Sequence, residues 1–307
     1  MLHINPEFSG PWTHFTSTGM NSGKTIYIVD DDDDDRMLAR EALENVIDKV
    51  EIIEVLDGQD LIDLLKLRAN SSEPFLIMLD INMPRMNGME TLARIRSDPD
   101  NEYIPVIMFS TSTDPRHVKN AYKIGVNAYL KKPVSIIDYT HMAESVNVCF
   151  LNNYPSSLIE LPLKKARTKS ILVIEDHPEH WELMRAALRQ SMPYAAITRM
   201  KDSESTLRFL ENEWHQMARQ PQLILMDMCI PNREQGLELL AKIRKFLRDN
   251  NLSTVPIIIF SNSAHQDDIK ACYQRQANAY ITKPRDLNDS LSYFKSLNEF
   301  IWDTYVE

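Results

Sequence analysis

Short apolar runs alternate with segments of helical periodicity along most of the chain. Between the runs, apolar residues recur at helical spacing, as in Leu38, Ala42 and Val46. The runs have the length of strands, and they predict strands over residues 25–29, 50–55, 75–79, 105–109, 127–130, 170–174, 195–199, 222–226, 256–260 and 278–281. The order of runs and helical segments predicts two α/β units that follow one another along the chain.

Two of these runs, 75–79 and 256–260, carry no polar residue on either face. Strands of this kind are buried on both sides, as in a parallel sheet that helices cover on both faces. We therefore expect each unit to be a doubly wound parallel sheet of five strands. In such sheets ligands bind in the crevice at the carboxyl ends of the strands.

The polar residues that follow the apolar runs occur twice, in the same order and at nearly the same spacing. In the first unit they are Asp30, Asp31, Asp80, Ser110 and Lys132. In the second unit they are Glu175, Asp176, Asp227, Ser261 and Lys283. Because the carboxyl ends of parallel strands meet at one edge of a sheet, each set is expected to converge in one crevice.

Such a crevice is suited to holding a divalent cation and an anion together. Carboxylates that converge near a low-dielectric sheet repel one another, and a hard cation such as Mg²⁺ relieves that repulsion. A lysine ammonium and a serine hydroxyl nearby favour an anion with several oxygens, for which a phosphoryl group is the natural candidate. A central aspartate, Asp80 or Asp227, is then placed to act as the nucleophile.

Each residue type taken alone has a simpler explanation. The unbroken run of aspartates that begins at Asp30 is typical of a solvated loop, and a lone Asp or Ser after a strand is typical of a turn or helix cap. The register assigns only Asp30 and Asp31 to the crevice. It assigns residues 32–35 to the loop and the helix start, where acidic groups suit the helix dipole. His177 is expected in a solvated loop and His180 on a helix surface.

The composition is that of a globular protein without a basic surface. Of the 307 residues 43% are hydrophobic and 25% are charged, and the formal net charge of −10 does not favour a nucleic-acid partner. No apolar run is long enough to span a membrane and no signal peptide is recognisable, so no membrane partner is expected. The cysteines match no metal or redox spacing and fit a reducing compartment, which predicts a cytoplasmic protein.

Two segments fall outside the repeats. Residues 1–24 are rich in Ser, Thr, Gly and Pro and are expected to form a flexible arm, and whether residues 1–19 are native is open. Residues 152–169 contain two prolines and a basic patch, which is typical of a linker. The units are then expected at 25–151 and 170–307, with no segment left for a separate output domain.

The residues around Asp80 identify the family that both units resemble. The segment from Asp80 to Gly88, with Pro84 between them, is similar to the acceptor loop of receiver domains in two-component response regulators. The resemblance covers roughly residues 24–151 and 169–303, and it implies two flavodoxin-like (βα)5 receiver domains in tandem. It also implies that Asp80 takes a phosphoryl group from a histidine kinase or a histidine phosphotransfer protein.

The resemblance also implies a Mg²⁺ site in each unit. Asp31 and Asp80 would bind the ion directly. Asp30 would act through water, and Asn82 would contribute its backbone carbonyl. The matching residues of the second unit are Glu175, Asp176, Asp227 and Cys229.

Residues that contact the phosphoryl group are implied in the same way. Lys132 would pair with its oxygens, Ser110 would move to hydrogen-bond it, and Tyr129 would change rotamer as the readout. The peptide bond before Pro133 is expected to be cis. The matching residues of the second unit are Lys283, Ser261, Tyr280 and Pro284.

The acceptor loop of the second unit departs from the family pattern. Cys229 stands where the first unit has Asn82, and its side chain cannot act like an amide near an attacking water. Gly236 lies one position later than Gly88 relative to the acceptor, which suggests a residue inserted before the third helix. The rate and lifetime of phosphorylation at Asp227 are therefore open, whereas the acidic pocket is expected to be present.

We expect a phosphoryl-accepting signalling protein rather than an enzyme, apart from self-phosphorylation and slow loss of the phosphoryl group. Phosphorylation would change contacts with a downstream protein through the fourth helix, fifth strand and fifth helix, about residues 112–150 and 263–302. The cognate kinase and the direction of phosphoryl flow stay open.

Two alternatives remain. In one, only the first unit is phosphorylated, and the second unit supports docking or a homodimer. In the other, the protein is a phosphohydrolase with an Asp nucleophile. The haloacid-dehalogenase type needs a second Asp two positions after the nucleophile, where this chain has Asn82 and Cys229.

Overall fold

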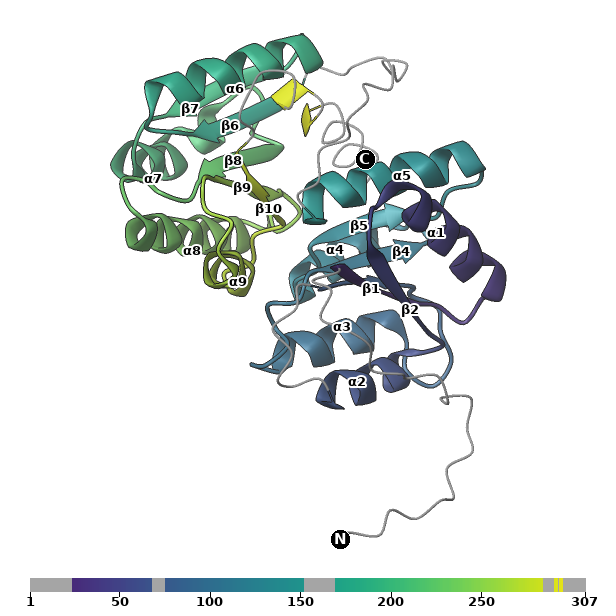
Figure 1. Ribbon diagram of the computed structural model, residues 1–307. Helices are drawn as coiled ribbons and strands as arrows, with labels where there is room; N and C mark the ends of the chain where they lie inside the picture. Colours follow the sequence, from purple (N-terminus) through teal and green to yellow (C-terminus); the bar gives the residue numbers. More distant parts are fainter. Residues whose placement is uncertain (1–23, 68–74, 152–168, 284–289, 292, 295–307) are drawn as a thin grey trace, which may run out of the picture.

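The chain folds into two α/β units of the same architecture (Figure 1). A computed structural model describes residues 24–67, 75–151, 169–283, 290–291 and 293–294. The predicted arm and linker therefore lie outside the described residues, apart from Lys24 and Lys169. Within the described ranges, no helix combines the length and the apolar content that crossing a membrane requires.

The first unit is built on a parallel sheet with the strand order β2-β1-β3-β4-β5. Its strands are β1 (Lys24–Val29), β2 (Val50–Val55), β3 (Phe75–Leu79), β4 (Val106–Ser110) and β5 (Ala128–Lys131). Its helices are α1 (Asp33–Val46), α2 (Gly58–Leu67), α3 (Gly88–Ser97), α4 (Pro115–Ile124) and α5 (Ile136–Leu151). Successive side chains of β1 point to opposite faces of the sheet. Ile26 and Ile28 pack in a core with α1 and α5, and Tyr27 packs in another core with α2, α3 and α4.

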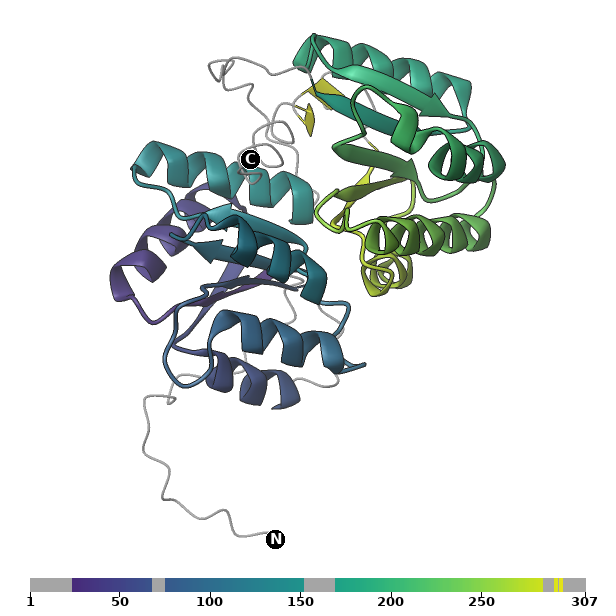
Figure 2. The ribbon, with the colours of Figure 1, turned by 180° about the vertical axis from the view of Figure 1, so that it is seen from behind.

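The second unit repeats this plan, and its strand order is β10-β9-β8-β6-β7. Figure 2 shows the two units from behind. Its strands are β6 (Ser170–Ile174), β7 (Ala196–Met200), β8 (Leu223–Asp227), β9 (Ile257–Ser261) and β10 (Ala279–Thr282). Its helices are α6 (Pro178–Ser191), α7 (Ser203–Asn212), the 3-10 turn η1 (Trp214–Gln216), α8 (Arg233–Asp249) and α9 (Gln266–Gln274). Helix α6 packs on one face of the sheet, and α7, α8 and α9 pack on the other.

The doubly wound parallel fold that the apolar runs predicted is confirmed in both units. Every predicted strand is present, and its ends lie within one residue of the expected ones. Strands β4 and β9 begin one residue late because Pro105 and Pro256 stand at the predicted starts. Proline has no backbone N–H to donate to a strand ladder.

The helix after β8 starts earlier than the sequence suggested. Helix α8 begins at Arg233 and is capped by the side chain of Asn232, whereas α3 begins at Gly88 and is capped by Asn87. The expected insertion before this helix is therefore wrong. Because Asn232 is a favourable cap, α8 begins before Gly236. The additional residue that shifts Gly236 relative to Gly88 therefore lies inside the first turn of α8.

The prediction of a cis peptide bond before Pro133 is also wrong. Among the described residues, the cis bond is the one between Ile230 and Pro231. The trans form is favoured by about 0.5–1 kcal/mol even for X–Pro bonds, so resemblance alone was a weak basis for the cis assignment. The bond before Pro284 lies outside the described residues.

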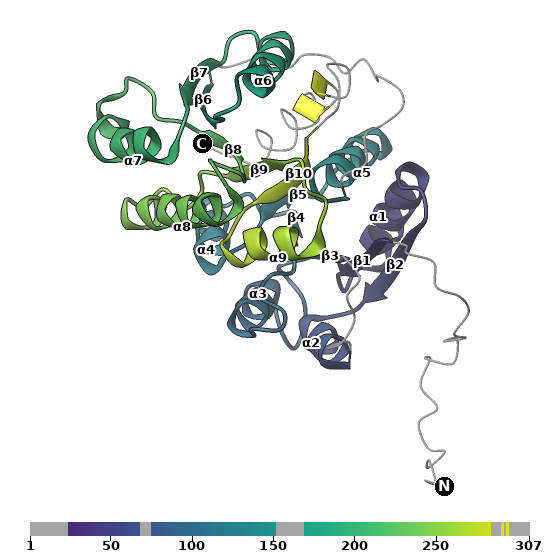
Figure 3. The same cartoon turned by 60° about the vertical axis from the view of Figure 1, so that its left-hand side comes forward.

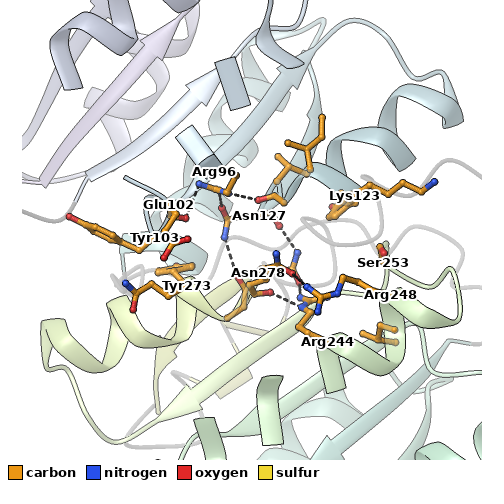
Figure 4. A pocket seen from close by; sticks show the side chains of 18 of the residues that line it. Arg96, Glu102, Tyr103, Lys123, Asn127, Arg244, Arg248, Ser253, Tyr273 and Asn278 are labelled. Carbon is orange, nitrogen blue, oxygen red and sulfur yellow. Dashed lines mark hydrogen bonds between the residues drawn. The ribbon is translucent and has the colours of Figure 1, made fainter. Parts of the chain in front are cut away.

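The two units meet where their edge strands β5 and β10 begin (Figure 3). Asn127 donates from Nδ2 to the carbonyl oxygen of Ala277 at 3.0 Å. Asn278 donates from Nδ2 to the carbonyl oxygen of Asn127 at 2.8 Å. Both asparagines line a pocket between the units, with Arg96 and Arg244 beside them (Figure 4). The contact is therefore nearly symmetrical, with each unit using the same position.

Helix α5 is enclosed on all sides near its C-terminal end. Residues 145–151 are all buried, although a helix on the surface of a single unit exposes one face. Strand β10 of the second unit packs against this helix. One apolar cluster accordingly runs through both units and includes Cys149 of α5 and Ile281 of β10.

Candidate functional site

The carboxyl edge of the first sheet brings two buried aspartates to one lysine. Asp30 follows β1, Asp80 follows β3, and Lys132 follows β5, so the parallel register places all three at the same edge. Lys132 Nζ lies 2.6 Å from Asp30 Oδ2 and 3.2 Å from Asp80 Oδ1. Asp30 is 2% exposed and Asp80 is 5% exposed. Charges so far from water need partners, and here each has one.

A third carboxylate completes a possible cation site. Oxygens of Asp30, Asp31 and Asp80 lie within 4.8 Å of one another. Asp31 is exposed to solvent, so that side of the group is open to water. An all-oxygen set of carboxylates with room for water suits Mg²⁺. The donor atoms therefore fit the ion that the sequence predicted.

A fourth acid, Asp35, reaches the same lysine and was missed at the level of sequence. Its Oδ2 lies 2.7 Å from Lys132 Nζ. Helix α1 starts at Asp33 because Asp32 caps it by accepting hydrogen bonds from the N–H groups of Asp34 and Asp35. The first turn of α1 then directs Asp35 toward the crevice. Residues 32–35 lie at the loop and helix start, as expected.

The crowding of charges changes how two groups of the site ionise. Burial raises the pKa of Asp30, although hydrogen bonds from Lys132 and from the backbone N–H of Asp32 oppose that shift. For Lys132, burial lowers the pKa, but the hydrogen bonds to Asp30 and Asp35 outweigh it, and the pKa is raised overall. The lysine is therefore held as a permanent cation among carboxylates.

The loop after Asp80 fixes the orientation of its carboxylate. The backbone N–H of Asn82 donates to Asp80 Oδ2 at 2.6 Å, which leaves Oδ1 facing Lys132. Gly88 lets helix α3 start directly against this loop. A Cβ at that position would lie 2.1 Å from the carbonyl oxygen of Asp80. Gly88 belongs to the motif that suggested the family, and in this chain a glycine is needed there for steric reasons.

The predicted switch residues form a buried chain next to the site. Ser110 is fully buried at the end of β4, and its Oγ accepts a hydrogen bond from the N–H of Ser112 at 3.3 Å. The hydroxyl of Tyr129 donates to the carbonyl oxygen of Ser112 at 2.7 Å. Burial raises the pKa of Tyr129, so its hydroxyl stays protonated and remains a donor. Both side chains are therefore tied to the loop that leads into α4.

The second unit assembles the matching residues in the same way. Lys283 Nζ lies 2.9 Å from Glu175 Oε2 and 2.6 Å from Asp227 Oδ2. Glu175 is fully buried and Asp227 is 5% exposed. The N–H of Cys229 donates to Asp227 Oδ1 at 3.0 Å, as Asn82 does in the first unit. Ser261 is fully buried at the end of β9.

The remaining predicted residues of the second unit are also placed. The hydroxyl of Tyr280 donates to the carbonyl oxygen of Ser263 at 2.8 Å, which repeats the arrangement of Tyr129. Cys229 is exposed as a residue, but partial desolvation of its thiol and the carboxylate of Asp227 raise the thiol pKa. Asp176 comes after Glu175, the first residue beyond β6, and is half-buried.

His180 stands in the acidic pocket of the second unit, which the sequence analysis did not foresee. Its Nδ1 lies 3.0 Å from Lys283 Nζ and 3.5 Å from Glu175 Oε1. The group whose ligand atoms lie within 4.8 Å of one another is Glu175, His180 and Asp227 rather than one that includes Asp176. His180 occupies the position of Asp35 when the two copies are aligned. The alignment pairs the two positions, but it does not show that either side chain faces the pocket.

Comparison with known proteins places this site in a family. The family profile described as "Response regulator receiver domain" matches residues 26–144 and 171–295, one match in each unit. The chain belongs to the response regulator receiver domain family. Its two receiver domains are the two units described above.

Individual relatives match the length of one unit. The Response regulator Rcp1 of Synechocystis sp. is 34% identical over 134 residues, which are 43% of this chain and 91% of that protein. The Chemotaxis protein CheY1 of Helicobacter pylori is 36% identical over 101 residues, which are 33% of this chain and 81% of that protein.

Crystal structures are similar as well. That of the phosphorylated cyanobacterial phytochrome response regulator RcpA has 34% identity and a TM-score of 0.40, and covers 42% of this chain and 94% of that one. That of the Mn²⁺-bound form of Rcp1 has 31% identity and a TM-score of 0.37, and covers 46% of this chain and 99% of that one.

Proposed function

We propose that the chain is a phosphoryl-accepting signalling protein that becomes phosphorylated on Asp80 and on Asp227. The donor is a histidine kinase or a histidine phosphotransfer protein of a two-component system. The observation that carries the proposal is the position of Asp80, whose Oδ1 faces Lys132 at 3.2 Å at the carboxyl edge of the sheet. The acidic pair Asp30 and Asp31 lies beside it. Three unpaired cysteines fit a reducing, cytoplasmic setting for this activity.

The transfer itself is a displacement at phosphorus. Oδ1 of Asp80 forms a bond to the phosphorus atom, and the bond from phosphorus to the donor histidine nitrogen breaks. The leaving imidazole keeps the electron pair and takes up a proton. Lys132 supplies a fixed positive charge for the phosphoryl oxygens, because its ammonium already faces Asp80. Asp227 and Lys283 would act in the same way in the second unit.

Mg²⁺ is the cation that fits the first unit best. Asp31 and Asp80 would bind it directly, with Asp30 beside them, because all three offer carboxylate oxygens within 4.8 Å of one another. When bound, the ion neutralises charge on the phosphoryl oxygens and on the crowded carboxylates. Asn82 would add its backbone carbonyl, and Asp30 would act through water.

The response to phosphorylation would start at Ser110 and Tyr129. Both contact residue Ser112, in the loop that leads from β4 into α4. A phosphoryl group adds about −1.5 to −2 charges, and a hydrogen bond from Ser110 to that group would pull on this loop. The face formed by α4, β5 and α5 also holds the second unit. Phosphorylation is therefore proposed to alter both the contact between the units and the binding of a downstream protein.

A second candidate limits phosphorylation to the first unit. It is favoured by His180 and Cys229, which make the second site chemically different from the first. In this candidate the second unit serves docking or dimerisation. A phosphohydrolase is not supported, since Asn82 and Cys229 provide no second acid after the nucleophiles.

Phosphorylation by a small-molecule donor separates these candidates. We expect phosphoramidate with Mg²⁺ to add two phosphoryl groups to the intact chain, as counted by mass spectrometry. Asp80→Asn and Asp227→Asn should each remove one group, and the double variant should carry none. Asp48→Asn changes an exposed carboxylate outside the site and should label like the wild type.

Two results would count against the proposal in different ways. If Asp80→Asn alone removed all phosphate, only the first unit would be an acceptor. If the double variant were labelled as fully as the wild type, the assignment of both acceptors would be wrong.

A further inference from the structure

We propose that the pocket of the second unit binds a divalent first-row transition metal ion through His180, Glu175 and Asp227, in preference to Mg²⁺. This inference rests on the proposed function, because it takes the acidic pocket to be a cation site. It goes further in assigning a nitrogen ligand to one of the two pockets. The tandem domains would then sense or use two different metals.

The position of Lys283 shows where a cation sits in this pocket. Its ammonium nitrogen lies 2.9 Å from Glu175 Oε2, 2.6 Å from Asp227 Oδ2 and 3.0 Å from His180 Nδ1. An ammonium group carries only donors, so Nδ1 of His180 is the acceptor and directs its lone pair at the cation. Two carboxylates and one imidazole therefore point their lone pairs at one place. A metal ion would replace the ammonium as their shared cation.

Comparison of the two pockets shows what the imidazole of His180 changes. At the matching position, Asp35 Oδ2 lies 2.7 Å from Lys132 Nζ, so the first pocket offers oxygen ligands alone. Carboxylate and water ligands suit Mg²⁺, whereas imidazole suits Zn²⁺, Cu²⁺, Ni²⁺ and iron. The exchange of Asp35 for His180 thus changes the class of metal that each pocket prefers.

The side chains around His180 hold this ligand set in place. Glu175 is fully buried, and its Oε1 accepts a hydrogen bond from the N–H of His177 at 3.1 Å. The guanidinium of Arg199 donates to the carbonyl oxygen of Glu175 from Nε at 3.2 Å and from a terminal nitrogen at 3.0 Å. The ring of His177 packs against that of His180, with centroids 4.4 Å apart and the ring planes tilted by 34°. His180 lies in the first turn of α6, which begins at Pro178.

Calorimetric titration of the full chain with Ni²⁺, without a polyhistidine tag and in excess Mg²⁺, tests the proposal. We expect one Ni²⁺ ion to bind per chain. His180→Asp gives the second pocket the ligand types of the first, and it should weaken Ni²⁺ binding at least about tenfold, since even outer-shell changes cost about 10- to 100-fold in metal affinity. His177→Asn removes the neighbouring imidazole and should leave one Ni²⁺ site. Asp35→His should create a second.

The outcomes separate this inference from the proposed function. If His180→Asp bound Ni²⁺ as tightly as the wild type, or if Asp35→His gained no site, the inference would be overturned. Titration with Mg²⁺ alone would then still show uptake by the first unit, and the proposed function would stand. If the chain took up neither Ni²⁺ nor Mg²⁺, both would fail together.

Discussion

Asp30 is a side chain of the first unit whose ionisation is changed by burial. It is 2% exposed, and it shares the carboxyl edge of the sheet with Asp80, while Lys132 lies 2.6 Å away. Burial raises its pKa, and the nearby carboxylate of Asp80 adds to the shift. Keeping Asp30 charged at this buried position therefore lowers the stability of the fold. The charge becomes useful only when the site binds a cation.

Replacing Asp30 should stabilise the metal-free protein. Because the folded pKa of Asp30 lies above the unfolded value, its contribution to stability is present below the unfolded pKa and is lost as pH rises through the folded pKa. Asp30→Asn avoids that loss at neutral pH. We expect its free energy of unfolding in EDTA to exceed that of the wild type by on the order of 1 kcal/mol, as measured by urea denaturation.

The difference should shrink as the pH falls, since wild-type Asp30 then becomes neutral as well. Asp48→Asn removes an exposed carboxylate and serves as the control for net charge. A metal-free Asp30→Asn variant less stable than the wild type at neutral pH would show that the pairing with Lys132 outweighs burial.

The sequence gives the main acids of the site but not all of its polar groups. Asp30 and Asp80 were predictable because each directly follows an apolar strand, and parallel strands end at one edge. Asp35 and His180 belong to the first turns of α1 and α6. Which side of a helical turn faces a pocket depends on the helix axis, and this is set by packing rather than by local pattern.

The glycines of the acceptor loops connect a helix to the site at the scale of elements. A Cβ at Gly88 would lie 2.1 Å from the carbonyl oxygen of Asp80, and a Cβ at Gly236 would lie 1.7 Å from that of Met228. Each helix thus packs directly on the backbone of its acceptor loop. In the second unit the approach moves along by one residue, from the acceptor to Met228, which accounts for the shifted glycine.

An added methyl group at either glycine should disturb the acceptor loop. We expect Gly88→Ala and Gly236→Ala to lower the free energy of unfolding by about 1–3 kcal/mol, because the methyl group would overlap a carbonyl oxygen that has no room to move away. Urea denaturation measures the loss. Arg94→Ala changes an exposed position of α3 and should cost much less. Equal losses for Gly88→Ala and Arg94→Ala would contradict the packing argument.

Elements were predictable where a single physical rule applies. The strands follow from uninterrupted apolar runs, and the one-residue shift of β4 and β9 follows from Pro105 and Pro256. The start of α8 was missed because the shifted position of Gly236 does not reveal that Asn232 already caps the helix. Local patterns identify an element more securely than they identify its first residue.

The contact between the units is the feature that involves the whole molecule. Asn127 uses Oδ1 within its own unit, where it accepts hydrogen bonds from the N–H of Val106 and from Arg96, each at 2.8 Å. It uses Nδ2 across the interface, toward Ala277. Asn278 divides its two ends in the same manner. One side chain in each unit therefore joins the fold of that unit to the contact.

Changing only the donor end of both asparagines should separate the units. Asn127→Asp with Asn278→Asp keeps the oxygen that each unit needs and places a second oxygen opposite a buried carbonyl. A buried polar group left without a partner costs about 1–3 kcal/mol. We expect the radius of gyration of the full chain, measured by small-angle X-ray scattering, to increase.

Asn87→Asp is the matched control, because Asp also caps a helix and Asn87 lies at the N-terminus of α3. It should leave the radius of gyration unchanged. An unchanged radius in the double variant would mean that the apolar contact between α5 and β10 suffices to hold the units together.

This arrangement could not be predicted from the sequence. Asn127 and Asn278 each stand at the first position of a predicted strand, where a polar residue is ordinary. The burial of residues 145–151 and the packing of β10 on α5 show that the second unit covers this helix. Helix α5 looks buried in sequence because it is rich in apolar residues, but the sequence does not say what covers it.

The identity of the phosphorylated residue tests the central claim most directly. After treatment with phosphoramidate and Mg²⁺, borohydride reduces an aspartyl phosphate to homoserine, and peptide mass spectrometry then locates the reduced residue. We predict homoserine at position 80, and at position 227 if the second unit is also an acceptor. Homoserine at position 31 or 35 instead, with Asp80 intact, would contradict the account.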